Sequence, residues 1–276
     1  MEPKNRNELL DILRGLGILI VILGHSLQGA NGGAIAGNFH RFILHFQMEL
    51  LFAISGFSAI YASKRTFANA MKRHLLRLGL PYVTWVVLFY IAEIAFGIKT
   101  WDASDAFSRF YTSGFWFLRN LLFIYTAFEI YACRKSVSRL VAASVTIFIL
   151  SRIPEQGLLL YYSSWFALGI SVHLLWRKTL PKKTLSNPLP SLISKPLCWC
   201  GKNSLALYAI HWNIFFAFLS CRLFNFNTLA NGKLGFPLTA LGLFMIYTAG
   251  SVIVIMLIKK LPLLPQILLG ESFSKR

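Results

Sequence analysis

The sequence predicts an all-α protein, a polytopic transmembrane helix bundle, and three observations support this fold class. Hydrophobic residues make up 56% of the 276 residues and charged residues only 14%, with a mean hydropathy of +0.58. A soluble domain of this size needs a far more charged surface. Apolar stretches also recur along nearly the whole chain, separated by short polar or basic stretches. Only helices satisfy their own backbone hydrogen bonds in hydrocarbon, so these stretches predict membrane-spanning helices.

We expect about eight membrane segments in a single domain that covers residues 1–276. The fifth has only about twelve residues, below the roughly twenty that a spanning helix needs. It either snorkels or forms a shallower hairpin with the sixth. In chain order the predicted segments are Leu9–Gln28, Arg41–Ala62, Leu80–Ile98, Phe115–Ala132, Leu140–Ser151, Leu158–Trp176, Asn203–Ser220 and Gly235–Ile258.

Basic residues alternate between the two sides of the predicted membrane. Twenty of the 28 Lys and Arg fall into five clusters, and the alternate loops hold few of them. The clusters are Lys4–Arg6, Lys64–Arg77, Arg134–Arg139, Arg177–Lys202 and Lys259–Arg276. By the positive-inside rule both termini are cytoplasmic. The net charge of +18 therefore reflects topology and contact with anionic lipid headgroups, and no nucleic-acid partner is expected.

Cysteine usage predicts neither a metal site nor a disulfide framework. The four cysteines are scattered at Cys133, Cys198, Cys200 and Cys221. The Cys198-x-Cys200 pair lacks a second Cys or His pair at the spacing of a zinc site.

Two ionisable residues, Arg14 and His25, interrupt the first apolar segment. An ionisable side chain within a membrane is costly and usually serves a function. Eleven residues at 3.6 per turn are nearly three whole turns, so both side chains project from one face, about 16 Å apart along the axis. Arg14 then lies near the cytoplasmic end and His25 near the opposite end.

This spacing suits a long donor with an anionic head that lies along the helix. A fixed cation holds phosphates at the inner side, while the imidazole meets the reactive end. Coenzyme A thioesters have this shape. The alternative is structural: Arg14 snorkels to the headgroups and pairs with Asp11, while His25 makes an interhelix hydrogen bond.

The second segment supplies further polar candidates. It runs antiparallel to the first, which brings Glu49 to a depth close to that of His25. A buried carboxylate there would orient the imidazole and stabilise its protonated form, as a general base requires. His45, one turn away, is either the rival partner or an interfacial histidine. Ser55-Gly56 allows close helix approach, while Ser55 lacks the glycine context of an activated nucleophile.

Five later residues could line the same site, and each has a structural alternative. Near the outer end of the fourth segment, a tryptophan, an arginine and an asparagine could bind a sugar, or the tryptophan could anchor at the interface beside a snorkelling arginine. In the seventh segment, a tyrosine and a histidine could line the cavity or make core hydrogen bonds. These five residues are Trp116, Arg119, Asn120, Tyr208 and His211.

Four stretches resemble the acyltransferase-3 family, in the family's order and over nearly the whole chain. Leu-Asp-Ile-Leu-Arg-Gly at 10–15 with His25 is similar to the family's opening motif, including the spacing from Arg14 to His25. Glu-Leu-Leu-Phe-Ala-Ile-Ser-Gly-Phe at 49–57 resembles its second motif. Two looser signatures match at 116–125 and 204–211. The chain departs from the family in being shorter between Tyr125 and Asn203, and in having Gln47 where fucose-acetylase-like members often have His.

The resemblance implies a multi-pass O-acyltransferase of the bacterial inner membrane that modifies surface or lipid-linked carbohydrate. Acetyl-CoA or another acyl-CoA is then the cytoplasmic donor substrate, with no tightly bound cofactor. It also implies that Arg14 engages the coenzyme and that His25 is the catalytic histidine. Direct transfer and an acyl-histidine intermediate are both consistent with these residues.

Two other classes of function use similar residues. Buried Arg, His and Glu also line the paths of transporters and flippases for lipid-linked glycans, although an internal repeat, common in such folds, is absent here. An intramembrane hydrolase would instead use Ser55 with His211.

Overall fold

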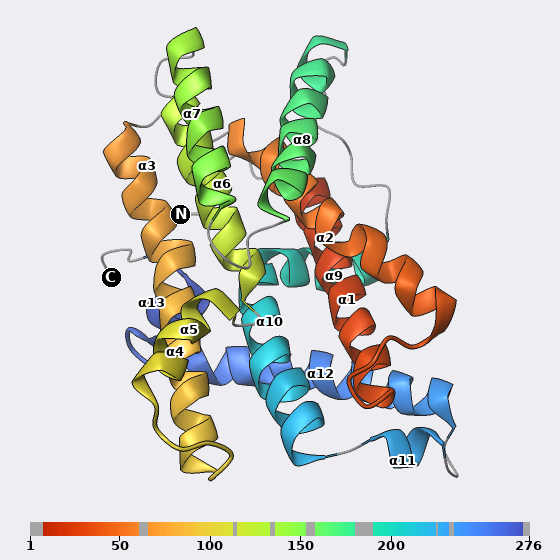
Figure 1. Cartoon of the computed structure of the whole chain (residues 1–276). Helices are drawn as coiled ribbons and strands as arrows, with labels where there is room; N and C mark the ends of the chain where they lie inside the picture. The colour runs from red at the N-terminus through yellow and green to blue at the C-terminus, as the bar shows by residue number, and fades with distance from the viewer. Residues whose placement is uncertain are drawn as a thin grey trace. The chain divides into compact units, whose positions relative to one another are not determined.

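The computed structural model describes residues 8–60, 66–112, 115–132, 136–152, 158–179, 190–224, 226–231 and 235–272, and every regular element in these ranges is helical (Figure 1). The predicted all-α class is confirmed. Six helices of the described chain are long and apolar enough to cross a membrane. They cover Glu8–Ala30, Gly37–Ala59, Phe67–Ala95, Leu159–Trp176, Ser204–Cys221 and Phe236–Ile258.

Each of the eight predicted segments coincides with a helix, but two of these helices are short. The fourth segment forms α6 (Trp116–Ala132, 17 residues) and the fifth forms α7 (Val137–Leu150, 14 residues). The described chain thus supports six candidate crossings by length. Eight crossings and cytoplasmic termini stay predictions.

The chain divides into two compact units, each made of segments distant in sequence. The first contains Met1–Ile54 and Val172–Ile258, and the second contains Ser55–Ser171 and Lys259–Arg276. Two of the three boundaries fall inside α2 (Gly37–Ala59) and α8 (Leu159–Thr179), and the third follows the end of α12 (Phe236–Ile258). A single domain over residues 1–276 stays a prediction.

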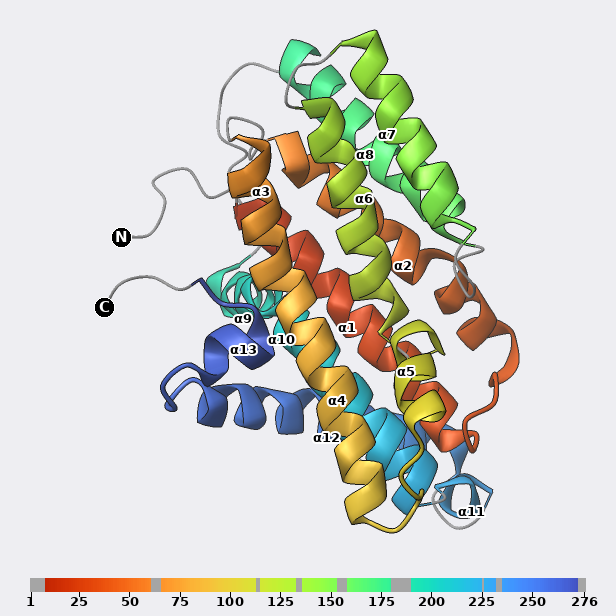
Figure 2. The ribbon, with the colours of Figure 1, turned by 60° about the vertical axis from the view of Figure 1, so that its left-hand side comes forward.

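The first unit is organised around α1 (Glu8–Ala30), which carries both Arg14 and His25. Helix α9 packs along the start of α1, and α12 crosses it further on (Figure 2). Besides α1 and parts of α2 and α8, the unit contains α9 (Ser191–Lys202), α10 (Ser204–Ile210), the π-helix η3 (His211–Leu223), α11 (Asn227–Ala230) and α12 (Phe236–Ile258).

Glycines set the closeness of α1 and α9. A Cβ at Gly15 would lie 2.1 Å from the carbonyl oxygen of Leu197, and one at Gly201 would lie 1.7 Å from that of Asp11. No larger residue fits at either crossing point without moving the backbone. The close approach buries Asp11 to 2% exposure inside a largely apolar helix.

The helix of the seventh segment changes its hydrogen-bond spacing at His211. Residues Ser204–Ile210 are α-helical and His211–Leu223 are π-helical. A π-helical stretch is rare and often marks a functional site. The side-chain amide of Asn213 donates to the carbonyl of Ala209 at 2.6 Å, which helps to satisfy the backbone where the spacing changes.

The second unit is built on a long rod in which α3 (Phe67–His74), the π-helix η2 (Leu75–Gly79) and α4 (Leu80–Ala95) follow without a break (Figure 2). Helix α6 packs against α3 and η2, and α7 packs against α6. The unit also contains α5 (Ala103–Thr112) and α13 (Leu264–Leu269). Within it, His74 Nε2 lies 3.0 Å from Glu129 Oε1, and its ring stacks on Tyr125.

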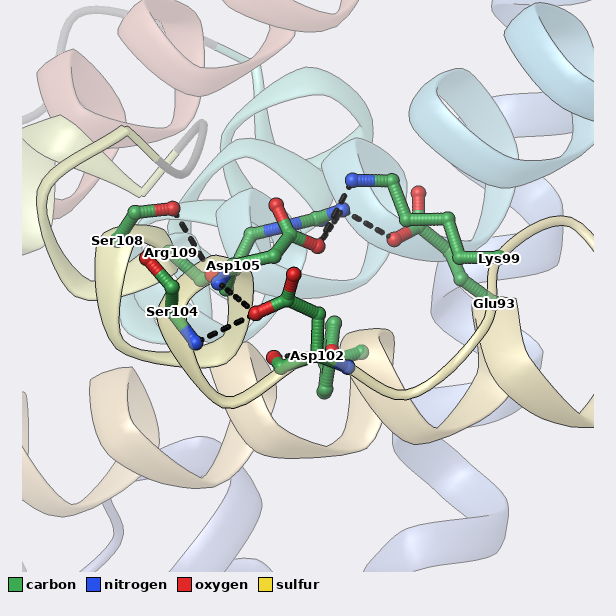
Figure 3. A network of polar contacts seen from close by, with 8 residues as sticks. Glu93, Lys99, Asp102, Ser104, Asp105, Ser108 and Arg109 are labelled. Carbon is green, nitrogen blue, oxygen red and sulfur yellow. Dashed lines mark hydrogen bonds and ion pairs between the residues drawn. The ribbon is translucent and has the colours of Figure 1, made fainter.

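A polar network holds the short helix α5 on α4 (Figure 3). Asp102 caps α5 because its carboxylate accepts from the backbone N–H groups of residues 104 and 105 at 2.7 and 3.2 Å. Arg109 reaches back to the fully buried Glu93 at 2.6 Å. Asp105 bridges Lys99 at 2.8 Å and Arg109 at 3.6 Å, so positive and negative charges alternate through the network.

Candidate active site in the first unit

Arg14 is held by a buried carboxylate of its own helix. Its guanidinium lies 3.6 Å from Asp11, one turn earlier, and its side chain keeps 27% of its surface exposed. This ion pair with Asp11 was predicted from the sequence as part of a purely structural role for Arg14. Asp11 therefore orients a guanidinium whose side chain remains partly exposed.

His25 lies against His211 from the seventh segment. The Nδ1 atom of His25 is 3.0 Å from the Nε2 atom of His211. The Nδ1 atom of His211 is in turn 2.6 Å from the carbonyl oxygen of Leu207. A series of hydrogen bonds thus joins the backbone carbonyl of Leu207 to the ring of His211 and then to the ring of His25. The two histidines are 186 residues apart in sequence.

The carbonyl of Leu207 determines which ring nitrogens of His211 and His25 carry a hydrogen. A carbonyl oxygen only accepts, so Nδ1 of His211 carries a hydrogen and donates it. In the neutral ring Nε2 of His211 is then an acceptor, and the hydrogen between the two rings belongs to Nδ1 of His25. Nε2 of His25 is left with a free lone pair. This tautomer follows from the hydrogen-bond network, and it is the form that a general base requires.

Aromatic rings enclose the imidazole of His25. Phe216 stacks on it with ring centres 4.9 Å apart, and the edge of Trp212 approaches it at 4.7 Å. Tyr208 is buried and lies edge-on to His211 at 6.0 Å. The structure thus brings one of the predicted cavity residues, His211, to the predicted catalytic histidine, and Tyr208 lies beside His211. His25 itself keeps 9% of its surface exposed.

The two candidate partners from α2 differ in their placement. Glu49 is buried at 6% exposure, as expected for a residue that acts inside the protein. His45 is exposed, and its Nδ1 bonds the carbonyl of Arg41 on its own helix at 2.6 Å. The partner that the structure gives to Nδ1 of His25 is His211. The orienting role of Glu49 stays a prediction.

Ser55 and Gly56 belong to the second unit. A Cβ at Gly56 would lie 1.9 Å from the carbonyl oxygen of Phe166, which confirms that this pair allows close helix approach. The carbonyl of Ser55 accepts a hydrogen bond from the hydroxyl of Tyr125 at 3.3 Å. These contacts give Ser55 a packing role, and its place in an acceptor site stays a prediction.

The remaining candidates, on α6, make structural contacts within the second unit. Trp116 stacks on Tyr162 with ring centres 5.1 Å apart. Arg119 is 5% exposed and donates to the carbonyls of Phe110 and Tyr111, the last turn of α5, at 3.0 and 2.5 Å. A cation at that end of a helix complements its dipole. Asn120 is likewise buried, and sugar binding by these three residues stays a prediction.

His40 was not among the candidate residues predicted from the sequence, and Gln47 was noted only as a departure from the family pattern. Both lie on α2 in the first unit, with exposures of 0% and 4%. A sequence signal existed, because residues seven apart on a helix share a face. Nothing in the sequence distinguished His40 from the interfacial His45.

No described part of the chain brings together three His, Cys, Asp or Glu side chains as a metal site would require.

Comparison with known proteins supports the pattern of motifs. Residues 7–184 match the sequence model of a family described as an acyltransferase domain, acyltransferase-3. The chain is also 29% identical over 180 residues to the nodulation protein NolL of Sinorhizobium fredii (strain NBRC 101917 / NGR234). The aligned part covers 60% of this chain and 48% of NolL, so the chain spans about half the length of this relative. No solved structure matches the chain.

Proposed function

Since the chain belongs to the acyltransferase-3 family, as its motifs predicted, we propose that it is an integral-membrane O-acyltransferase that moves an acyl group from cytoplasmic acyl-CoA to a carbohydrate hydroxyl. Family membership confirms a membrane acyltransferase at the level of the family. The donor, the acceptor and the bacterial inner membrane as its location are parts of the proposal. One observation carries it: a backbone carbonyl acts through His211 to leave Nε2 of His25 free as a base.

The donor end of the proposal rests on Arg14. Its position is fixed by the buried Asp11, and its side chain is partly exposed. Arginine binds phosphate through paired N–H groups, so Arg14 suits the phosphates of coenzyme A. The uninterrupted helix α1 carries Arg14 and His25 eleven residues apart, about 16 Å along its axis. An extended pantetheine arm would bring the thioester toward His25.

The chemistry then needs one base and no covalent enzyme intermediate. Nε2 of His25 takes the proton of the acceptor hydroxyl while its oxygen forms a bond to the thioester carbonyl carbon. The electron pair displaced onto the carbonyl oxygen returns as the carbon–sulfur bond breaks. The leaving thiolate of coenzyme A takes the proton from Nε2, so His25 ends as it began. His211 stabilises the transient imidazolium by accepting from Nδ1.

Labelled donor tests the proposal in membranes. Inside-out vesicles from cells that express the full chain receive acetyl-CoA labelled in the acetyl group, and label is measured in the glycolipid and glycan fractions. We expect His25→Ala to abolish transfer but leave acetyl-CoA binding near that of the unchanged protein, and Arg14→Ala to weaken binding. Cys221→Ser alters an exposed thiol in the same unit and serves as the neutral control.

Two results would refute the proposal. If His25→Ala transfers label at a near-normal rate, the imidazole is not the base. If the unchanged protein leaves all label on the coenzyme while glycolipid crosses the membrane, the chain is a transporter, the rival that buried Arg, His and Glu also allow.

A further inference from the structure

One face of α2 within the first unit carries two buried polar atoms that the described protein does not satisfy. His40, Ile43 and Gln47 follow one another at spacings of three and four residues, and all three are buried, while Arg41 and His45 between them are exposed. Seven residues are two helical turns to within about 20°, so His40 and Gln47 project in the same direction, about 10 Å apart along the axis. This set, His40, Ile43 and Gln47, is called the α2 inner face below.

His40 presents a hydrogen-bond donor. The backbone N–H of Ala36 donates to its Nδ1 atom at 3.0 Å, which makes Nδ1 an acceptor and places the hydrogen of the neutral ring on Nε2. That Nε2 atom is buried and has no hydrogen-bond partner within the described residues. The loop before α2 therefore fixes both the tautomer of His40 and its unused N–H.

Gln47 presents an acceptor beside α1. Its Oε1 atom is buried and receives no hydrogen bond from any described residue. It lies against the backbone next to the catalytic histidine, because a Cβ built on Gly24 would be 2.8 Å from Oε1 and 3.4 Å from Ile43. The α2 inner face thus packs against α1 at the residue that precedes His25.

Two buried polar groups without hydrogen-bond partners lower the stability of the fold. A fold therefore tolerates two on one face where a ligand completes them. The two groups differ in polarity, and one is a donor while the other is an acceptor. A hydroxyl group both donates and accepts, so a neutral polyhydroxylated ligand satisfies both at once. A phosphate has no donor for Gln47, and an apolar chain satisfies neither group.

We propose that the α2 inner face binds the carbohydrate acceptor, with Nε2–H of His40 donating to one sugar oxygen and Oε1 of Gln47 accepting from another hydroxyl. These contacts hold the reactive hydroxyl at Nε2 of His25 and determine which sugars are accepted. The inference rests on the proposed function and adds the acceptor's binding residues to it. A span of about 10 Å exceeds one sugar ring, so the two contacts fall on neighbouring rings or on a ring and its substituent.

The test separates acceptor binding from donor binding and from folding. Purified full chain in nanodiscs is assayed with labelled acetyl-CoA and a panel of octyl glycosides and octyl disaccharides of glucose, fucose and N-acetylglucosamine. The variants are His40→Phe, Gln47→Leu and the conservative His40→Gln, which keeps an N–H donor. Gln266→Leu is the matched control. Gln266 is also a glutamine whose buried Oε1 accepts no hydrogen bond from any described residue, but it belongs to α13 of the second unit.

We expect His40→Phe and Gln47→Leu each to raise the KM of the best acceptor about 10- to 100-fold, which corresponds to one lost hydrogen bond to a buried group. The KM of acetyl-CoA should not change, and His40→Gln should recover part of the acceptor affinity. Gln47→Leu should leave Tm unchanged or higher, because it removes an unsatisfied buried atom. Gln266→Leu should affect Tm in the same direction and leave the acceptor KM unchanged.

Deoxy sugars identify the contact. A glycoside that lacks the hydroxyl bound by Gln47 should bind the unchanged protein poorly and lose nothing further in Gln47→Leu, so the two changes are not additive.

Four outcomes would overturn the inference. Unchanged acceptor KM in both variants means that water satisfies the two atoms. A loss in kcat alone for His40→Phe places its N–H at the acyl carbonyl. Additive deoxy effects exclude the Gln47 contact. No saturable binding by any glycoside of the panel, while the unchanged protein still transfers label to membrane glycans, excludes the α2 inner face as the glycoside site. The proposed function fails separately, through retention of activity in His25→Ala.

Discussion

Replacing His211 tests the tautomer relay most directly. In the unchanged protein, Nδ1–H of His25 donates to Nε2 of His211 at 3.0 Å in a buried environment. His211→Phe keeps a flat ring of similar size but removes the acceptor. The N–H of His25 then lacks a partner, and a buried donor without one costs about 1–3 kcal/mol. The ring regains a bond only by turning or by moving its proton to Nε2, and both changes remove the base from its working position.

The expected loss follows from that energy. If the cost falls on the reactive tautomer, 1–3 kcal/mol corresponds to a decrease in kcat of about 5- to 150-fold. The KM of acyl-CoA should stay the same, because Arg14 lies about three turns away on α1. His211→Gln, whose amide oxygen can accept from His25, should recover part of kcat.

Single-turnover kinetics with labelled acetyl-CoA measure this step, and a thermal melt of each variant separates catalysis from folding. The reasoning is refuted if His211→Phe keeps kcat within about twofold while the melt shows a folded protein. It is also refuted if His211→Gln and His211→Phe lose the same amount, because the acceptor atom would then have no role.

Three further predictions concern packing and charge. Gly201→Ala should lower the free energy of unfolding by about 3 kcal/mol or more, measured by thermal melts in detergent, because its Cβ would lie 1.7 Å from the carbonyl oxygen of Asp11. Glu93→Gln should cost about 3 kcal/mol in the same melts, because it removes one partner of a 2.6 Å buried ion pair; an unchanged melt would contradict this. The hydrogen bond from Lys99 lowers the pKa of Asp105 below its usual 3.8. Its contribution is therefore complete above that value and is lost as the pH falls through the lowered pKa. Hydrogen exchange in α5, corrected for its intrinsic pH dependence, should rise in an acid titration below pH 3.8 more in the unchanged protein than in Asp105→Asn.

Local patterns in the sequence were sufficient to predict where the helices of this protein lie. Apolar runs of about twenty residues predict helices whatever packs around them, and each of the eight predicted segments coincides with one in the structure. The spacing of Arg14 and His25 was equally reliable because both lie on α1. The number of membrane crossings was harder to predict. Helices α6 and α7 have 17 and 14 residues, which is shorter than the roughly twenty residues that a membrane-spanning helix needs.

Contacts between distant segments were not predictable in the same way. His25 and His211 are 186 residues apart, and no local pattern states that their rings meet. The sequence favoured Glu49 as the partner because it lies on the adjacent segment. The role of Asp11 also depends on a distant element, because only the crossing of α9 at Gly201 explains why a carboxylate is buried there.

Two buried histidines in this chain show why the partner matters more than burial. His74 in the second unit faces Glu129 through Nε2 at 3.0 Å. A carboxylate only accepts when ionised, so this Nε2 carries a hydrogen and cannot take a proton from a substrate. His25 in the first unit is bonded through Nδ1 to an imidazole whose own proton is fixed by a carbonyl, and its Nε2 is left free. The same residue type is thus bonded to a carboxylate in one unit and has its Nε2 available in the other, so the proposed catalytic role of His25 rests on the carbonyl of Leu207 rather than on the burial of His25.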